Sequence, residues 1–184
     1  MKRILIFIVS FGVVFLIVTG SVNIAAGGNH SRGMVMVAMG GGSLDEAMFI
    51  NGDADATFSF FGGYDKHGAF KGNFFAKRWV SGAGLASVKS TEITDIQVGM
   101  DGDSAWIMMT GIVDFMPAWS NKHSPGHRFT LIAWDNDSFG DGNDMIWFQV
   151  KRPFPDDYIR PAISLLEYCE VKGGNILILP QVLE

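Results

Sequence analysis

The chain is 184 residues long, carries a formal net charge of −5 at pH 7, and contains 23 glycines and 15 phenylalanines. Only 14 lysines and arginines are present, too few to form the basic face that neutralises a phosphate backbone, so nucleic acid is excluded as an expected partner. The length fits one domain with its own hydrophobic core. The glycine and phenylalanine content favours a turn-rich β protein over a helical bundle.

Residues 1–26 show the pattern of a signal peptide. A positively charged start, Met-Lys-Arg, precedes a largely apolar stretch at residues 4–18, and small residues follow it. We expect cleavage near Ala26, with Ser21 as the second choice. An uncleaved membrane anchor is the alternative, because residues 4–26 are long enough to cross a bilayer. Both alternatives predict a secreted or cell-surface protein, whose only contact with a membrane is an uncleaved N-terminal segment.

A single β-sandwich domain is expected over residues 34–184, after a flexible, glycine-rich lead-in at residues 27–33. Short apolar or alternating runs, separated by glycine or Asp-Gly turns, recur through the domain. They occupy residues 34–39, 56–61, 72–80, 85–90, 93–98, 104–115, 127–135, 145–151 and 175–179. This spacing predicts an all-β fold, an antiparallel sandwich or barrel of about eight to nine strands. A short helix is predicted near residues 160–168, after Pro161.

Alternation within two of these runs predicts which side of each strand is buried. In residues 104–115 the apolar face consists of Ala105, Ile107, Met109 and Val113. In residues 127–135 it consists of Phe129, Leu131 and Ala133. The opposite faces mix polar and apolar residues, so we expect a sheet with one covered face.

The aromatic residues suggest a binding surface, because tryptophan and tyrosine rings can stack on sugars. The residues that could form such a platform are Trp79, Trp106, Trp119, Trp134, Trp147 and Tyr64. We expect most of the tryptophans in the core, since aromatic side chains fill the interior of β-sandwiches. Trp119 lies in a predicted loop beside polar residues, and we expect it to bind a ligand.

The most acidic stretch is residues 135–144, with the sequence DNDSFGDGND. A helical-hand calcium loop requires an oxygen ligand at its fifth position and glutamate at its twelfth, where this chain has Phe139 and Ile146. That motif is therefore excluded. A different calcium site remains open, because clustered carboxylates repel one another without a counter-ion. Its expected ligands are Asp135, Asp137, Asp141 and Asp144, and the alternative is a solvated hairpin turn.

His123 and His127 are four positions apart, but Pro125 and Gly126 between them exclude a zinc-binding helix. We expect both histidines in an exposed loop that contributes to ligand binding with Trp119. The sequence has no nucleophile elbow, zinc-protease motif or phosphate loop, so no catalytic residue is predicted and the chain is not expected to be an enzyme. The only cysteine, Cys169, excludes an intramolecular disulfide and is expected to be buried and inert.

Four stretches in this order resemble a known family. They are the triple glycine of residues 40–42, the alternating Phe58 and Phe60, the strand at residues 127–135, and the sequence GGNILI at residues 173–178. Together they resemble the post-COAP domain of secreted bacterial proteins. The resemblance implies an exported all-β domain, often appended to larger cell-surface proteins, and no activity that could be transferred. The long acidic loop and the segment at residues 154–171 depart from the family pattern.

These observations predict an exported, non-catalytic module for binding or structural assembly at the cell surface, stabilised by calcium at the acidic loop. The expected partner is a surface protein or a polysaccharide. One alternative is a carbohydrate-binding or hydrolytic secreted domain that uses Trp119, His123, His127 and nearby acids. Another is a filament or multimer subunit, in which an edge strand such as residues 34–39 pairs with a neighbouring sheet.

Overall fold

The computed structural model describes residues 35–82, 84–119, 122–136, 143–153, 159–160 and 162–179. These residues form nine β-strands and contain no helix, and so none that could cross a membrane. The strands are β1 (Val35–Phe49), β2 (Gly52–Tyr64), β3 (Phe70–Val80), β4 (Gly84–Asp101), β5 (Ser104–Met116), β6 (Ser124–Asp135), β7 (Met145–Lys151), β8 (Cys169–Glu170) and β9 (Asn175–Ile178). The all-β prediction is confirmed.

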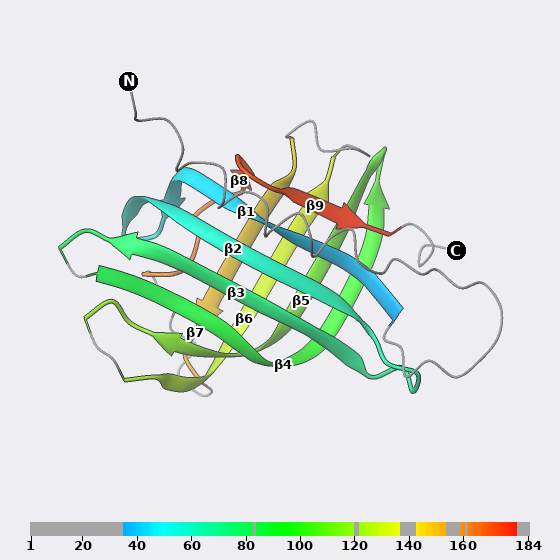
Figure 1. Cartoon of the computed structure of the whole chain (residues 1–184), viewed down its shortest axis with the longest axis horizontal. Helices are drawn as coiled ribbons and strands as arrows, with labels where there is room; N and C mark the ends of the chain where they lie inside the picture. Colours follow the sequence, from blue (N-terminus) through cyan, green and yellow to red (C-terminus); the bar gives the residue numbers. More distant parts are fainter. Residues whose placement is uncertain are drawn as a thin grey trace, which may run out of the picture. The chain divides into compact units, whose positions relative to one another are not determined.

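All nine strands belong to one antiparallel sheet in the order β8-β7-β6-β5-β4-β3-β2-β1-β9. Strands β1 to β7 each pair with the next strand along the chain, whereas β9 returns to pair with the outer side of β1. The sheet is strongly curled into a half-barrel (Figure 1). Of the two architectures that the sequence predicted, the barrel-like one therefore describes the domain better than two separate sheets.

Strand β4 is where the sheet changes direction. It is the longest strand, with 18 residues, and its pairing with β5 has register shifts between Ser90 and Glu92 and between Ile93 and Asp95. An extra residue at such a shift bends the strand and increases its twist. The bend turns β1–β3 toward β5–β7 across the interior of the same sheet (Figure 1).

Phenylalanine rings join these two halves in the core. The Phe74 ring of β3 lies 5.0 Å from the Phe129 ring of β6 and 5.4 Å from the Phe148 ring of β7. Phe49 of β1 contacts the same Phe148 ring at 6.3 Å. The predicted inner faces of β5 and β6 are confirmed at Ile107, Met109, Val113, Phe129, Leu131 and Ala133, which are all buried. Ala105, at the start of β5, is only partly buried and packs against this core.

The expectation that most tryptophans lie in the core is wrong. No tryptophan is among the buried residues of the described part of the chain. Trp79 and Trp119 are 63% and 68% exposed, and Trp106, Trp134 and Trp147 are half-buried on the strand faces opposite the core. The phenylalanines fill the interior, so the alternation of each strand leaves the tryptophans outside.

The predicted helix near residues 160–168 is also wrong. In the described part of this segment, the Leu165 amide donates to the Phe148 carbonyl (3.0 Å) and the Leu166 amide donates to the Met48 carbonyl (2.8 Å). The Ser164 carbonyl accepts from the Ile50 amide at 3.1 Å. Because strands β1 and β7 and the turn after β1 use these backbone groups, the groups are not available for the hydrogen bonds of a helix.

Residues 35–39 do not form the exposed edge that the sequence suggested. They belong to β1, which lies between β2 and β9. Ala38 and Met39 pair with β9 on one side and with β2 on the other. The edge strands are β8 and β9, separated in the chain only by residues 171–174.

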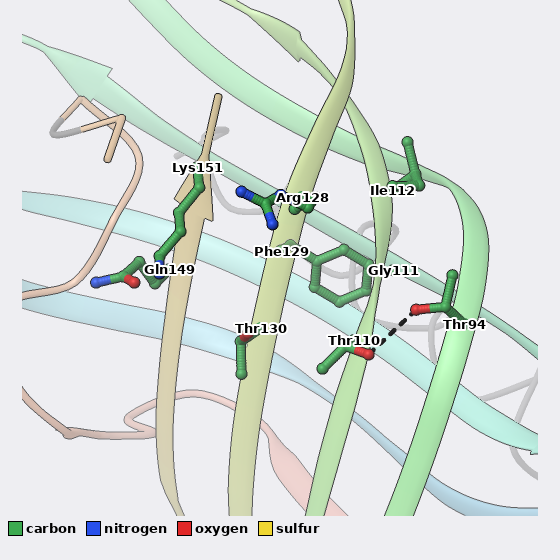
Figure 2. Close-up of a pocket in the computed structure, with 9 residues that line it drawn as sticks. All are labelled: Thr94, Thr110, Gly111, Ile112, Arg128, Phe129, Thr130, Gln149 and Lys151. Carbon is green, nitrogen blue, oxygen red and sulfur yellow. Dashed lines mark hydrogen bonds between the residues drawn. The ribbon is translucent and has the colours of Figure 1, made fainter. Parts of the chain in front are cut away.

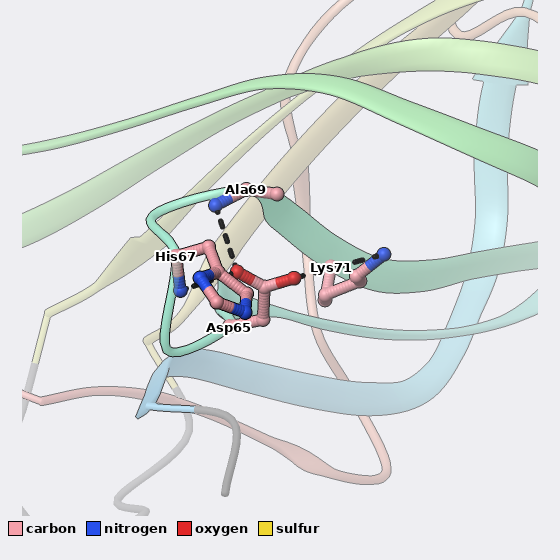
Figure 3. Close-up of polar contacts among 4 residues, drawn as sticks. All are labelled: Asp65, His67, Ala69 and Lys71. Atoms are coloured by element: carbon pink, nitrogen blue, oxygen red, sulfur yellow. Dashed lines mark hydrogen bonds and ion pairs between the residues drawn. The ribbon is translucent and has the colours of Figure 1, made fainter. Parts of the chain in front are cut away.

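Asp65 organises the turn between β2 and β3 (Figure 3). Its carboxylate accepts hydrogen bonds from the His67 amide at 2.8 Å and the Ala69 amide at 3.0 Å, and Lys71 Nζ lies 4.0 Å away. These two backbone hydrogen bonds lower the pKa of Asp65 below its usual value. Gly68 completes the turn with a φ of 78°, which glycine adopts without strain. The isolated His67 is therefore a turn residue in this fold.

Candidate functional site

The outer face of strands β4–β7 presents an ordered set of side chains. Neighbouring strands align Trp106 with Trp134, Met108 with Ile132 and Trp147, and Thr110 with Thr130 and Gln149. The last row aligns Ile112 with Arg128 and Lys151. All of these side chains are partly exposed, because their neighbours along each strand point into the core. The face is therefore aromatic at one end, polar in the middle and cationic at the other end.

The aromatic end contains an open hollow of about 480 Å³. Its lining residues are Gln97, Met100, Asp101, Trp106, Met108, Ile132 and Trp134. Tyr168 extends the aromatic surface, with its ring edge-on to Trp134 at 4.6 Å and tilted against Trp147 at 6.2 Å. We call this group of residues the aromatic hollow.

Gly99 allows the Trp106 ring to lie against β4. A Cβ atom at this glycine would stand 2.6 Å from Cε2 and Cζ2 of the ring, closer than atoms in contact can approach. The ring therefore lies directly over a strand position without a side chain. The hollow owes its flat wall to a glycine opposite a tryptophan in the register of β4 and β5.

The cationic end contains a second hollow, of about 330 Å³, shown in Figure 2. Its lining residues are Thr94, Thr110, Gly111, Ile112, Arg128, Phe129, Thr130, Gln149 and Lys151. Arg128 and Lys151 are direct partners on β6 and β7, and the Thr94 and Thr110 hydroxyls are 3.1 Å apart. We call this group of residues the cationic hollow. It lies beside the β4 register shifts, and the buried Gly111 and Phe129 contribute to its lining.

His127 lies on the inner face of β6 and is fully buried. The expectation of two exposed loop histidines is therefore wrong for His127, although His123 is exposed as expected. The Nδ1 atom of His127 is 3.2 Å from the Lys151 carbonyl oxygen, and its Nε2 atom is 2.9 Å from the Ser124 hydroxyl. A carbonyl only accepts, so Nδ1 carries the proton and donates, and Nε2 accepts from Ser124.

Arg160 lies against the same ring, with its guanidinium 5.2 Å from the centroid of Phe115 and one nitrogen 3.4 Å from His127 Nε2. Burial lowers the pKa of His127 most, and the charges of Arg160 and Arg152 lower it further, against the opposing effects of the Lys151 carbonyl and Asp114. A general base must accept a proton, and the nearby arginines oppose that change. The Ser124–His127 pair resembles a nucleophile and its base, but its surroundings favour a structural role.

We expect His127 to make the domain less stable in weak acid. Since its pKa is lowered in the folded state, the unfolded chain takes up the proton first as the pH falls below about 6.5. Stability should be at its highest above this pH and should fall by at most about 1.4 kcal/mol per pH unit below it. Urea unfolding at pH 7 and pH 5 measures the effect.

His127→Gln should reduce this pH dependence, while the matched change at the exposed ring, His123→Gln, should leave it intact. Equal pH dependence in the wild-type protein and the His127→Gln variant would contradict the assignment.

Asp135 and Asp144, two of the four predicted calcium ligands, bind the backbone of the edge strand β9. Asp135 Oδ2 accepts from the Ile178 amide at 3.0 Å, and Asp144 Oδ2 accepts from the Ile176 amide at 2.6 Å. Asp144 Oδ1 also accepts from the Asn136 amide at 3.2 Å. Both aspartates are buried, 9% and 2% exposed. These carboxylates therefore connect the β6–β7 hairpin to the strand at the opposite edge of the sheet.

The calcium site stays a prediction. Asp137 and Asp141 lie outside the described residues. No cluster of three or more histidine, cysteine, aspartate or glutamate residues that could hold a metal occurs in the part of the chain that the structure describes. The structure adds a role that the sequence did not suggest, since the two ends of the acidic loop support β9.

Trp119 is 68% exposed in the connection between β5 and β6, and His123 is exposed in the same connection. Their role in ligand binding stays a prediction. His127 does not share their accessible surface, because its ring faces the core. Strand alternation already predicts that Trp106 lies on the same side of β5 as Thr110, and that Trp134 lies on the same side of β6 as Arg128. The two hollows depend in addition on how neighbouring strands are aligned, and the sequence of a single strand does not show that alignment.

No family model matches this chain, and neither a curated protein nor a solved structure matches it. The resemblance to the post-COAP domain therefore stays a prediction, and the function must be inferred from the site itself.

Proposed function

We propose that this chain is an exported, non-catalytic binding module that recognises a polysaccharide on the outer face of β4–β7. The pairing of Trp106 with Trp134 in the open aromatic hollow carries the proposal. A sugar ring has an apolar face of C–H groups, which suits a flat aromatic wall, and hydroxyls around its rim. Gln97 and Asp101, at the border of the same hollow, supply hydrogen-bonding groups for those hydroxyls.

The N-terminal sequence supports export, because a positive start and an apolar stretch precede the domain. The surroundings of Ser124 and His127 support a non-catalytic role. Assembly through edge strands is less favoured, since β8 has only two residues and two carboxylates already accept from amides of β9. Binding on the open sheet face agrees best with these features.

Trp134→Ala should weaken polysaccharide binding by about thirtyfold, the effect of losing about 2 kcal/mol from a central aromatic contact. Isothermal titration of the purified protein against a panel of soluble polysaccharides measures this change. Trp79→Ala is the matched control, because Trp79 is an exposed tryptophan on β3, outside the binding face. The proposal fails if no polysaccharide binds or if both variants lose the same affinity.

A further inference from the structure

We propose that the polysaccharide is acidic and that its carboxylate groups bind to Arg128 and Lys151 in the cationic hollow. This inference rests on the proposed function, since it adds a second subsite to the same face. The polymer would lie along β6, with sugar rings stacked in the aromatic hollow and a uronate carboxylate at the other end.

Arg128 and Lys151 bring two positively charged side chains to neighbouring positions at this end of the face. Arg128 and Lys151 are direct cross-strand partners on β6 and β7, and both side chains line the cationic hollow (Figure 2). A carboxylate that lies in this hollow is attracted by the positive charges of both side chains. The planar guanidinium of arginine can also form two parallel hydrogen bonds to a carboxylate.

The hollows follow one another along a single strand. Outward positions of β6 carry Trp134, Ile132, Thr130 and Arg128 in succession, with the first two in the aromatic hollow and the last two in the cationic hollow. Trp134 and Arg128 are six positions apart on an extended strand, a distance of about 20 Å at about 3.3 Å per position. This length fits several sugar rings, which favours a polymer over a single sugar.

The middle of the face suits a hydroxylated chain. Thr110, Thr130 and Gln149 form one cross-strand row in the part of the cationic hollow nearer the aromatic hollow, and Thr94 lies beside Thr110. Their hydroxyl and amide groups both donate and accept hydrogen bonds, as the hydroxyls of a sugar do. A lipid or an apolar peptide would leave these groups without partners.

Acidic residues on β4 limit how charged the ligand can be. Asp95 stands in the row of Thr110, held by a 2.8 Å hydrogen bond from Gln97, and Asp101 lines the aromatic hollow. These carboxylates repel a dense polyanion such as a nucleic acid or a heavily sulfated glycan. A polyuronate is a better match, because its carboxylate can lie at the β6–β7 side while its hydroxyls donate to the acids on β4.

The test compares polygalacturonate with its methyl ester, which keeps the sugar backbone and removes the charge. The wild-type full-length protein should bind the acid about tenfold or more tightly than the ester, as expected for one charge-assisted contact. The double variant Arg128→Gln with Lys151→Gln should lose this preference and keep its affinity for the ester. Trp134→Ala should weaken binding to both polymers.

Two single variants separate loss of the subsite from a failure of the double variant to fold. Lys151→Gln alone tests the subsite if the double variant does not fold, and it should reduce the preference for the acid. Arg128→Lys should retain part of the preference, because it keeps the charge and loses the two parallel hydrogen bonds.

Equal affinity of the wild-type protein for acid and ester overturns the acidic subsite, and the proposed function then stands if Trp134→Ala still weakens binding. Tighter binding to dextran sulfate than to polygalacturonate, lost in the double variant, overturns the assignment to carboxylates. If neither these polymers nor the wider panel binds, the proposed function and this inference both fail.

Discussion

Asp144→Ala is expected to lower the free energy of unfolding by about 3 to 4 kcal/mol, the sum of two lost hydrogen bonds to a charged, buried acceptor. The carboxylate is 2% exposed and accepts from the amides of Ile176 and Asn136. Alanine has no acceptor, so the buried Ile176 amide is left without this partner. Urea unfolding of the wild-type and variant proteins at neutral pH measures the change.

Asp103→Ala is the matched control, because Asp103 is an exposed aspartate in the turn between β4 and β5. It should change stability by no more than about 0.5 kcal/mol. Asp144→Asn should fall between the two, since the amide oxygen keeps one acceptor. A loss in Asp144→Ala as small as that in Asp103→Ala would show that the carboxylate does not hold β9.

The same unfolding curves can test the predicted calcium site. If excess calcium raises the stability of the wild-type protein, and Asp137→Ala removes this rise, the acidic loop binds the ion. If the unfolding curves are the same with a chelator and with calcium, the loop serves only to join β6 to β7 and to bring Asp135 and Asp144 to β9. The Asp144→Ala comparison is made without calcium, because its predicted effect depends on the amides of Ile176 and Asn136 alone.

The acidic loop shows why part of this fold is readable from sequence and part is not. Its aspartates are conspicuous because charge density is a local property of the chain. Their partners Ile176 and Ile178 lie 32 and 43 positions away, and no pattern around Asp135 or Asp144 indicates them. The sequence therefore drew attention to these aspartates through their charge, while their contact with a distant edge strand required the structure.

The tryptophans show the opposite case, in which a local pattern was correct and a general tendency misled. Alternation placed Trp106 and Trp134 on the faces opposite Ile107 and Leu131, and the structure agrees. The tendency of aromatic residues toward burial pointed to the core instead. It failed because phenylalanines already fill that space, and only the geometry of the whole sheet decides how many large rings fit.

Gly174→Ala is expected to destabilise the domain by about 3 kcal/mol, the upper part of the usual range for adding a methyl group where no space exists. Gly174 directly precedes β9 and lies against β1. A Cβ atom there would overlap the carbonyl oxygen of Gly41 and stand 2.7 Å from the Gly41 carbonyl carbon. Both are backbone atoms, so β9 would have to move away from β1.

Gly41→Ala is the matched control within the same contact. A Cβ atom at Gly41 meets the Phe58 carbonyl oxygen at 3.3 Å and the Ser59 Cβ at 3.6 Å, close to ordinary contact. Alanine loses less conformational freedom than glycine when a strand forms, and this gain offsets part of any strain. The free energy of unfolding should therefore change by no more than about 1 kcal/mol. Urea unfolding of both variants tests the difference, and similar losses would show that the strands are not held at this distance.

The contrast between Gly174 and Gly41 also gives a physical reason for the two glycine clusters, residues 40–42 and 173–174. Gly42 would place a Cβ atom 2.7 Å from Val171 Cγ1, and Gly40 would place one 2.6 Å from the Phe60 ring. Strand β1 therefore meets β9 and its approach through positions without side chains. The close contact between β1 and β9 would by itself explain these two glycine clusters, which resemble part of a secreted-domain signature, independently of any ligand. A large loss of unfolding free energy in Gly174→Ala, beside a small loss in Gly41→Ala, would establish this explanation.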